Sequence, residues 1–185
     1  GVNPNYLCYE LMQKKPPIKP LKVLDVGCGE GKDAVFLAKN GYIVTAFDMA
    51  ESGLEKGRML AEKNGTYVNF YKADINDFEL QDNYDIIFCS GVFHYMKPEK
   101  RTEVVEKLKK HTNSGGLHVI NVFVEKPFIK NLEKEHSHLW KSGELFMHYH
   151  DWKIHTMEEF VFDCNSGGVA HQHCMDVMIA EMWNE

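Results

Sequence analysis

The stretch KVLDVGCGEGKDAVFLAKNGYIVTAFD, residues 22–48, most constrains what this chain can fold into. It reads as an apolar strand, a glycine-rich turn, a helix with one apolar face, and a second strand that ends in Asp48. A strand, a glycine turn and a helix in this order open a nucleotide-binding α/β unit. Ligands of such units bind outside the carboxyl ends of the strands, so the turn marks the edge where we expect the site.

The spacing of the glycines indicates which kind of nucleotide is bound. Gly27, Gly29 and Gly31 form G-x-G-x-G, whereas the dinucleotide fingerprint G-x-G-x-x-G needs its third glycine at position 32, which is Lys. Asp25 also stands two residues before the first glycine, where that fingerprint asks for no acid. Both features disfavour a nicotinamide cofactor.

Helices and strands are expected to alternate along most of the chain. The apolar periodicity predicts helices at residues 6–14, 33–39, 52–63, 98 to about 111, and 144–149. It predicts strands at residues 21–26, 42–47, 68–71, 84–89 and 117–124, which alternation with helices makes a parallel sheet. Residues 127–143 have no clear period and are expected to form an excursion with a short helix. Two last strands, 153–162 and 171–182, are joined by the hairpin signal at 165–168.

Composition narrows the classes of function. A chain of 185 residues is long enough for one domain with a substantial core. Its formal charge of −6 and pI near 5.9 give no basic face for nucleic acid. It has no apolar run of membrane-spanning length and no secretory signal, and its five cysteines form no C-x-x-C pair. We therefore expect a cytoplasmic protein with no nucleic-acid or membrane partner, and the oligomeric state stays open.

Four places in the sequence together resemble the S-adenosylmethionine (SAM) site of the class I, Rossmann-like methyltransferases. They are the glycine turn, Asp48, the Ala73-Asp74-Ile75 step and the turn at residues 113–116. Four further features are GCGEGKDAVFLAKNGYIVTAFD, KSGELFMHYHDWKI, a histidine-bearing hairpin and a final MIAE. Through them the chain more narrowly resembles the tellurite-resistance methyltransferase family. These are small single-domain SAM enzymes that act on tellurium and selenium oxyanions. The chain departs from that family at Lys32, where Arg is usual, and in a hairpin without the usual arginines.

The resemblance implies a fold class and a domain layout. The fold class is α/β, a Rossmann-like three-layer sandwich with a seven-stranded, mostly parallel sheet that ends in an antiparallel hairpin. Residues 1–20 would form an N-terminal helix and a proline-containing linker, and residues 21–185 the SAM-dependent methyltransferase domain.

The amino-acid end of the cofactor is expected to lie against the glycine turn. Glycines there let the backbone approach the ligand without a Cβ clash, and Cys28 is expected to be a small residue of the turn, not a reactive thiol. Asp25 would face the methionine ammonium; its alternative role is to cap the amides of the turn. Ser90 opens the segment that should border the transferred methyl group.

The nucleoside end is expected beside the second and third strands. Asp48 would accept hydrogen bonds from the two ribose hydroxyls, or instead cap the helix that follows. Asp74 would bind the adenine amino group, with Met49 and Ile75 on either side of the ring. The alternative for Asp74 is an Asx turn with Asn76.

Methyl transfer needs a protein base only when the acceptor carries a proton. His94, His171 and His173 are the candidates, and His173 is favoured because His171 and His173 share one face of a strand. The alternatives are a helix-cap histidine and exposed hairpin histidines without a role. Cys164 and Cys174 could join the last two in a zinc site, but the spacing matches no standard ligand pattern, so no metal is predicted.

The sequence therefore predicts methyl transfer from SAM to a small acceptor, a tellurium or selenium oxyanion or another soft nucleophile, with S-adenosylhomocysteine (SAH) as product. The alternatives are a small-molecule O-, N- or thiol methyltransferase, a nicotinamide oxidoreductase, and a SAM-binding module without catalysis. The Asn/Asp-Pro-Pro-aromatic tetrapeptide of many amide and base methyltransferases is absent after residue 89, which argues against a DNA or glutamine substrate.

Overall fold

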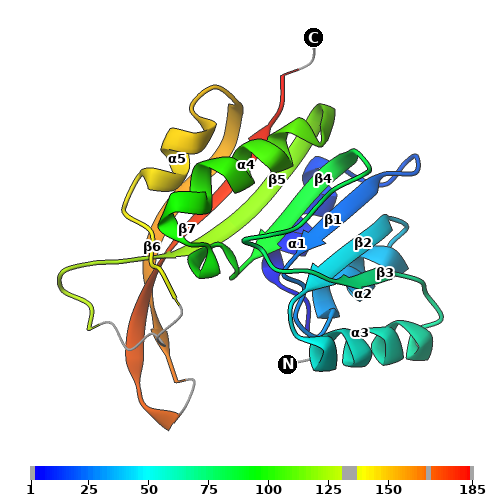
Figure 1. Cartoon of the computed structure of the whole chain (residues 1–185), viewed down its shortest axis with the longest axis horizontal. Coiled ribbons are helices and arrows are strands. Elements are labelled where there is room, and N and C mark those ends of the chain that lie inside the picture. Colours follow the sequence, from blue (N-terminus) through cyan, green and yellow to red (C-terminus); the bar gives the residue numbers. More distant parts are fainter. Residues whose placement is uncertain (1–2, 131–136, 166–167, 184–185) are drawn as a thin grey trace.

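The computed structural model describes residues 3–130, 137–165 and 168–183, and within them one seven-stranded sheet runs through the molecule (Figure 1). The strand order is β3-β2-β1-β4-β5-β7-β6. The first five strands in the chain are parallel: β1 (Lys22–Val26), β2 (Ile43–Asp48), β3 (Asn69–Lys72), β4 (Tyr84–Ser90) and β5 (Thr112–Val124). β7 (His171–Glu181) runs antiparallel between β5 and β6 (Lys153–Cys164). The predicted fold class is confirmed.

Helices cover both faces of the sheet and make two hydrophobic cores. On one face α1 (Tyr6–Lys14), α2 (Lys32–Lys39) and α3 (Glu51–Lys63) contribute Leu7, Leu11, Ala34, Leu37 and Ala61 to a single core. On the other face α4 (Arg101–Lys110) and α5 (Glu144–Tyr149) contribute Val104, Val105, Leu108, Leu145 and Tyr149. α1 packs into the same core as β1. The division of the chain at residue 20 into an N-terminal segment and a methyltransferase domain stays a prediction.

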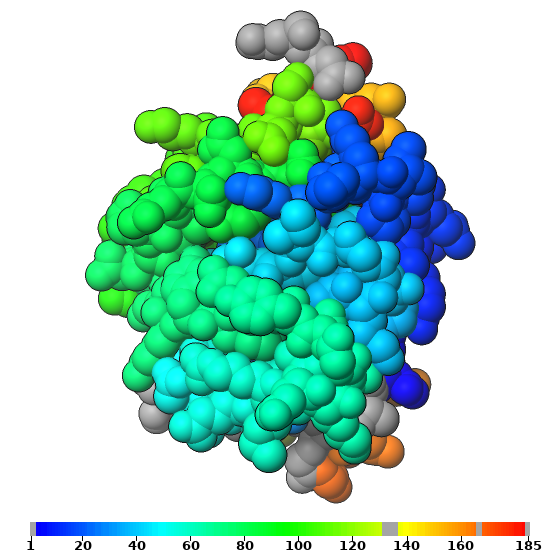
Figure 2. Space-filling model, turned by 90° about the vertical axis from the view of Figure 1, so that its right-hand side faces the viewer, coloured from blue at the N-terminus to red at the C-terminus, as the bar shows by residue number. Residues whose placement is uncertain are grey.

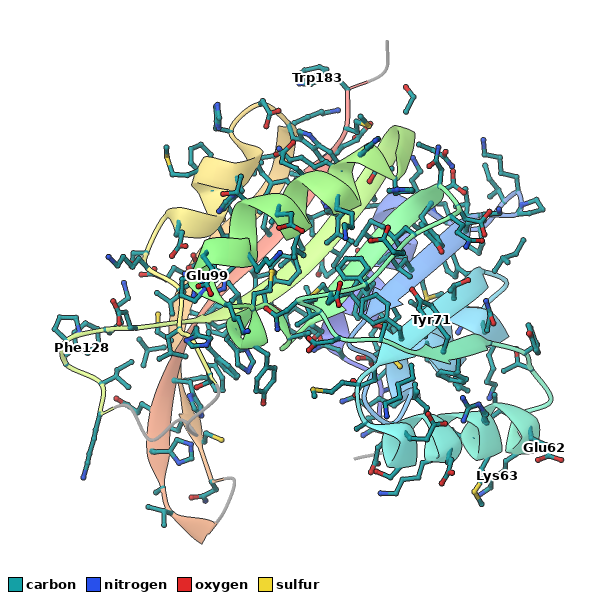
Figure 3. The ribbon with its side chains drawn as sticks, in the orientation of Figure 1. Glu62, Lys63, Tyr71, Glu99, Phe128 and Trp183 are labelled. Atoms are coloured by element: carbon teal, nitrogen blue, oxygen red, sulfur yellow. The ribbon has the colours of Figure 1, made fainter. Side chains whose placement is uncertain are left out.

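The first half of the chain builds one side of the molecule. Figure 2 looks onto this side and shows a surface coloured mostly from blue to green, with α3 lying across it. Figure 3 shows Phe128 and Trp183 projecting away from the sheet, where they are 71% and 63% exposed. Within the described ranges, no helix has both the length and the apolar character needed to cross a bilayer.

Most element boundaries differ from the predicted ones by a residue or two, and β5 differs more. It begins at Thr112 instead of residue 117, with a shift in its register against β4 between Tyr84 and Ile86. A Cβ on Gly116 would lie 2.5 Å from Cγ2 of Thr112, so glycine permits this irregular pairing. The helix predicted from residue 98 begins with a 3₁₀ turn, η2 (Pro98–Lys100), before α4.

The excursion before α5 is only partly described. Residues 127–130 and 137–143 contain no helix, and residues 131–136, where the predicted short helix would also fall, lie outside the described residues. Trp140 returns to the sheet and forms a bridge with Val124.

The sheet register sets where the site lies. β1 pairs with β2 up to Val26 and Phe47, and with β4 up to Asp25 and Phe88. The carboxyl ends of these three strands therefore meet at one edge, directly before the glycine turn. In the other half of the sheet, β5 and β7 pair only as far as Val124 and Cys174. Beyond this point β6 and β7 continue as a two-stranded ribbon, seen at the foot of Figure 1.

Candidate cofactor and active site

The turn after β1 needs its glycines. Gly27, Gly29 and Gly31 have φ angles of 68°, 54° and 75°, in the left-handed region that side chains rarely adopt. A Cβ on Gly27 would lie 2.4 Å from Cγ2 of Val92, and one on Gly31 would lie 2.8 Å from the ring of Phe70. At Gly29 nothing lies within 4 Å, so this residue faces open space. The turn is therefore closely packed at Gly27 and Gly31 and open at Gly29.

Three backbone amides of the turn have partners inside the protein. The N–H of Cys28 donates to the carbonyl of Phe47, and that of Gly31 to the carbonyl of Cys28, each at 2.9 Å. The N–H of Gly29 donates to Oδ2 of Asp48 at 2.9 Å. A pyrophosphate bound at a helix N-terminus needs amides of this kind as donors. These three amides are therefore not free to donate to a pyrophosphate.

Three carboxylates gather around the same turn. Asp25 is 3% exposed, and its burial, followed by the nearby charges of Asp33 and Asp48, raises the pKa of its carboxyl well above the usual value. Oδ1 of Asp33 accepts a hydrogen bond from the backbone of Asn5 at 2.7 Å. Crowded acids of this kind are stabilised by a cation and repel a phosphate. The site thus suits a positively charged ligand.

Asp48 bonds to the backbone just before α3, and ribose binding by its carboxylate stays a prediction. Besides the bond from Gly29, its Oδ1 accepts from the N–H of Ala50 at 2.8 Å, at the start of α3. A carboxylate has about four lone-pair sites, so these two bonds leave capacity for ligand hydroxyls. Capping and ribose binding are therefore compatible at this residue.

Two pockets adjoin the turn and share Gly27, Gly29 and Ser90 in their linings. The first is the more polar of the two and is also lined by Asn5, Asp25, Cys28, Glu30, Lys32, Asp33, Lys56 and Leu60. The second is largely apolar and is also lined by Phe47, Asp48, Met49, Ala73, Ile75, Val92 and Tyr95. A polar compartment joined to an apolar one fits a ligand with an amino-acid end and a planar base.

Asp74 lies apart from this lining. It is exposed, and its Oδ1 accepts hydrogen bonds from the backbone and the side-chain nitrogen of Asn76 at 2.9 and 3.1 Å. These are the contacts of the Asx turn considered as its alternative. Its neighbours Ala73 and Ile75 do line the apolar pocket. An adenine contact by Asp74 stays a prediction.

Two asparagines that sequence reasoning missed hold the segment after β4. Asn5, just before α1, donates from Nδ2 to Oγ of Ser90 at 2.8 Å. Asn121, 2% exposed on β5, donates to the same oxygen at 3.0 Å and accepts from the N–H of Gly91 at 2.6 Å. The only sequence signal was that Asn5 precedes a predicted helix, as an N-cap does. Together they fix Ser90 where both pockets meet.

The three candidate histidines lie near one another but outside the linings of these two pockets. The His94 ring lies between Tyr95 and Phe123, with centroids 4.2 and 4.8 Å away, and the His173 ring is 4.7 Å from that of Phe123. His171 in turn contacts His173. The His94 ring contacts Tyr95, which lines the apolar pocket.

His94 is buried and neutral. It is 2% exposed, its Nδ1 has no hydrogen-bond partner, and burial together with His173 lowers its pKa to about 4. A neutral imidazole can accept a proton, which is what a base requires. Its basicity is nevertheless weak at this pKa.

A further pocket lies on the hairpin side of Phe123. It is lined by His173 and Cys174 and by three lysines, Lys126, Lys130 and Lys141, among others. Lys126 forms ion pairs with Glu159, while Lys130 and Lys141 are exposed. With Glu125 also in the lining, the lysines leave this pocket a modest excess of positive charge.

The motif KSGEL has a structural role. Arg101, 6% exposed on α4, donates to Oε1 of Glu144 at 2.7 Å and to the carbonyl of His138 at 2.7 Å. Its guanidinium also lies over the ring of Trp140, 4.6 Å from the centroid. These contacts fix the end of the excursion against the sheet.

Comparisons with known proteins agree with this geometry. The family model described as "Tellurite resistance protein TehB" matches residues 8–167. The probable S-adenosyl-L-methionine-dependent methyltransferase TehB of Haemophilus influenzae is 32% identical over 137 residues, which are 74% of this chain and 48% of that protein. A ubiquinone biosynthesis O-methyltransferase of Rickettsia prowazekii is 31% identical over 116 residues, 63% of this chain and 45% of that protein. The chain spans about half the length of the curated relatives it matches.

Solved structures give the same result for the fold. The crystal structure of TehB from Haemophilus influenzae superposes with a TM-score of 0.86 at 26% identity, covering 96% of this chain and 62% of the other. The [4+2]-cyclase SpnF has a TM-score of 0.77 at 14% identity, with coverage of 97% and 81%. The second likeness shows the fold alone, and a cyclase shares it, so the reaction must be argued from the site.

Proposed function

Since the chain belongs to the tellurite resistance protein TehB family, we propose that it binds SAM at the glycine turn and transfers the cofactor's methyl group to a small acceptor. One observation carries the choice of cofactor. Asp25, Asp33 and Asp48 lie around the turn, and the amides of Cys28, Gly29 and Gly31 donate within the protein. SAM brings an ammonium and a sulfonium to such a site, whereas a dinucleotide brings a pyrophosphate. The nicotinamide alternative has no support in this geometry.

The residues then have distinct tasks. Asp25 and the turn hold the amino-acid end in the polar pocket, and Asp48 takes the ribose hydroxyls. Met49 and Ile75 border the apolar pocket in which the adenine would lie, and Ser90 stands between the two pockets. The methyl group would therefore be presented near Ser90, at the carboxyl end of β4.

The reaction is an in-line displacement. The bond between sulfur and the methyl carbon breaks with its electron pair going to sulfur, and the acceptor's lone pair forms the new bond to carbon. SAM thereby becomes SAH, a neutral thioether. An anionic acceptor loses one unit of negative charge in this step and releases no proton, whereas an acceptor that attacks through a protonated atom must lose a proton. The protein's contribution is to align the two reactants and exclude water.

We propose that the acceptor is anionic or otherwise unprotonated, as a tellurium or selenium oxyanion would be. Two observations support this choice. None of the three candidate histidines lines the cofactor pockets, so none of them is placed there as a base. The lysine-bearing pocket beside His173 also supplies positive charge on the acceptor side.

A second candidate is methyl transfer to the oxygen of a small hydroxylated acceptor. The match to the O-methyltransferase of Rickettsia prowazekii favours it, together with the neutral ring of His94 next to Tyr95. This reaction releases a proton, so it needs a base. The requirement for a histidine therefore separates the two candidates.

The test is a mass-spectrometric screen of methylated products after incubation with SAM and tellurite, selenite, thiols, phenols or small amines. We expect methylated tellurium or selenium and stoichiometric SAH. His94→Ala, His171→Ala and His173→Ala should each keep turnover within a few-fold of the parent if the acceptor arrives as an anion. A loss of about 10²–10⁴ in one variant, with unchanged SAH affinity, would establish a base and favour the O-methyl candidate. If the chain binds SAH but forms no methylated product, the alternative of a SAM-binding module without catalysis would be favoured.

A further inference from the structure

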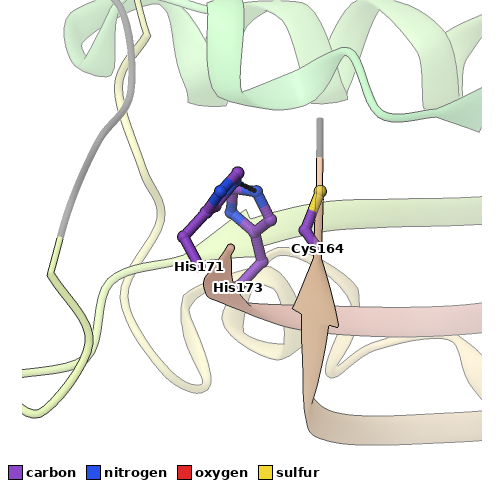
Figure 4. A group of neighbouring side chains, drawn as sticks. All are labelled: Cys164, His171 and His173. Carbon is purple, nitrogen blue, oxygen red and sulfur yellow. Dashed lines mark hydrogen bonds between the residues drawn. The ribbon is translucent and has the colours of Figure 1, made fainter. Parts of the chain in front are cut away.

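We propose that Cys164, His171 and His173, at the tip of the C-terminal hairpin, bind a borderline-soft metal ion, and that Zn²⁺ is the cation that fits this ligand set. Each residue offers one ligand atom, and these atoms all lie within 4.8 Å of one another. Figure 4 shows the thiol and the two imidazoles gathered on one side of the hairpin. Nitrogen and thiolate sulfur are the ligands that Zn²⁺ prefers, whereas Mg²⁺ and Ca²⁺ prefer oxygen.

The pairing of the two strands creates this cluster. Cys164 is the cross-strand partner of His171, and His173 follows two residues later on the same strand. Directly paired side chains of an antiparallel pair share a face, as do residues i and i+2 of one strand. All three therefore point to one side. The expectation of no metal rested on spacing along the chain, and that spacing cannot reveal a ligand set assembled across a hairpin.

The two imidazoles are already oriented for coordination. Nδ1–H of His171 donates to the carbonyl of Val169 at 2.7 Å, which leaves its Nε2 with the lone pair. Metal-binding histidines commonly donate their second nitrogen in this way. Nε2 of His171 lies 2.9 Å from Nε2 of His173, close to the separation of about 3.3 Å for two nitrogens on a tetrahedral Zn²⁺. The His173 ring is held by those of Phe123 and Phe162, at 4.7 and 5.7 Å.

The tip is also a place where a metal would stabilise the fold. Past the pair Val124–Cys174 no strand in the described part of the chain adds to the ribbon, and two-stranded ribbons are marginally stable alone. An ion held by Cys164 and by both histidines would cross-link β6 to β7. Three protein ligands leave the fourth tetrahedral position to water or to an anion, and His173 also lines the lysine-bearing pocket.

The test is titration of the whole chain with Co²⁺, a spectroscopic substitute for Zn²⁺. We expect one tightly bound Co²⁺ with the visible absorption of a tetrahedral ion and a near-ultraviolet thiolate-to-metal band. Zn²⁺ should displace it and Mg²⁺ should not. A chain that takes up no Co²⁺, or shows only the weak spectrum of an octahedral ion, would overturn the proposal. None of these readouts depends on methyl transfer or on SAM.

Single variants identify the ligands. Cys164→Ser should abolish the near-ultraviolet band, and His171→Gln and His173→Gln should each weaken Zn²⁺ binding at least about tenfold. His150→Gln, an exposed histidine outside the cluster, is the matched control and should leave the titration unchanged. Circular dichroism of each metal-free variant shows whether it is folded. A thiolate band that survives Cys164→Ser in a folded protein would contradict the site.

Discussion

The glycine turn and the tip of the C-terminal hairpin both gather polar side chains, but they are built in different ways. The turn lies where three parallel strands end, and its backbone bonds to nearby groups, as the N–H of Gly29 does to the carboxylate of Asp48. The tip extends beyond the sheet, and its cluster depends on the pairing of Cys164 with His171. A site formed by strand ends is held by the core, whereas a site on a ribbon is held by its own cross-links.

This contrast suggests that the turn binds the cofactor and that the hairpin binds the acceptor or an ion. The turn side is held by hydrogen bonds within the protein, and a cofactor used in every turnover benefits from a rigid site. The hairpin side contains the lysine-bearing pocket and the three-residue cluster, whose geometry a bound ion or acceptor would complete. Variants on the turn should therefore affect cofactor affinity, and variants on the hairpin should not.

The largest effect is expected from Gly27→Ala. A methyl group there would lie 2.4 Å from a Val92 carbon in a backbone with φ of 68°, so clash and strain together should cost about 2–5 kcal/mol of stability. SAH affinity should fall at least tenfold. Gly65→Ala is the matched control, because φ is 61° there and nothing lies within 4 Å. It should lose about 1–2 kcal/mol from strain alone and bind SAH normally. Equal losses in both variants, by urea unfolding and calorimetry, would contradict the packing argument.

The next effect concerns the buried ring of His94 at acid pH. Its folded-state pKa is lowered to about 4, so in the range from about 6.5 down to 4 the unfolded chain binds the proton more readily. The free energy of unfolding should therefore fall with pH through this window, and this residue should contribute about 3 kcal/mol of that fall. His94→Phe removes the titration, so its stability should decline less steeply than that of the parent. Parallel curves for the two proteins in urea titrations from pH 7.5 to 4 would rule the effect out.

Asp48 should rank third. Asp48→Ala removes the acceptor for the ribose hydroxyls and should weaken SAH binding by about 1.5–3 kcal/mol, because charge-assisted hydrogen bonds are lost. Asp74→Ala is the informative comparison, since Asp74 is exposed and bonded to Asn76. A smaller change for Asp74 than for Asp48 is expected by calorimetry. An equal change would assign the adenine contact to Asp74 after all.

Asn5→Ala should have the smallest effect. Its side chain caps α1 through the N–H of Leu7 and donates to Ser90, so its loss should cost about 0.5–2 kcal/mol of stability. SAH affinity should fall a few-fold, because Ser90 loses one of its two supports. Asn40→Ala removes a comparable side-chain bond, to the carbonyl of Phe36 at the end of α2, and should leave affinity unchanged. Equal SAH affinities for the two variants would show that the contact between Asn5 and Ser90 does not contribute to cofactor binding.

The same contrast explains what could be predicted from the sequence. The strand–turn–helix unit and Asp48 are local features, and they led to the confirmed fold class and family. The predicted bounds of α1 and α5 agree with the structure for the same reason, since helical periodicity is local. Antiparallel order at the end of the sheet followed from the hairpin signal at residues 165–168.

Long-range contacts could not be predicted. Asn5 meets Ser90 across 85 residues, and Arg101 meets Glu144 across 43. Nothing in the sequence near either residue specifies its partner. The burial of His94 likewise depends on Phe123, which lies on β5. The cluster at Cys164 became visible only once the register of β6 and β7 was known.

The most direct test of the central claim is isothermal calorimetry of this chain with SAH, SAM and NADH in parallel. The acids and satisfied amides of the glycine turn predict one molecule of SAH or SAM bound per chain, lost or strongly weakened in Asp48→Ala, and no heat with NADH. Binding of NADH, or no heat with either sulfur ligand, would contradict the assignment of this turn to SAM.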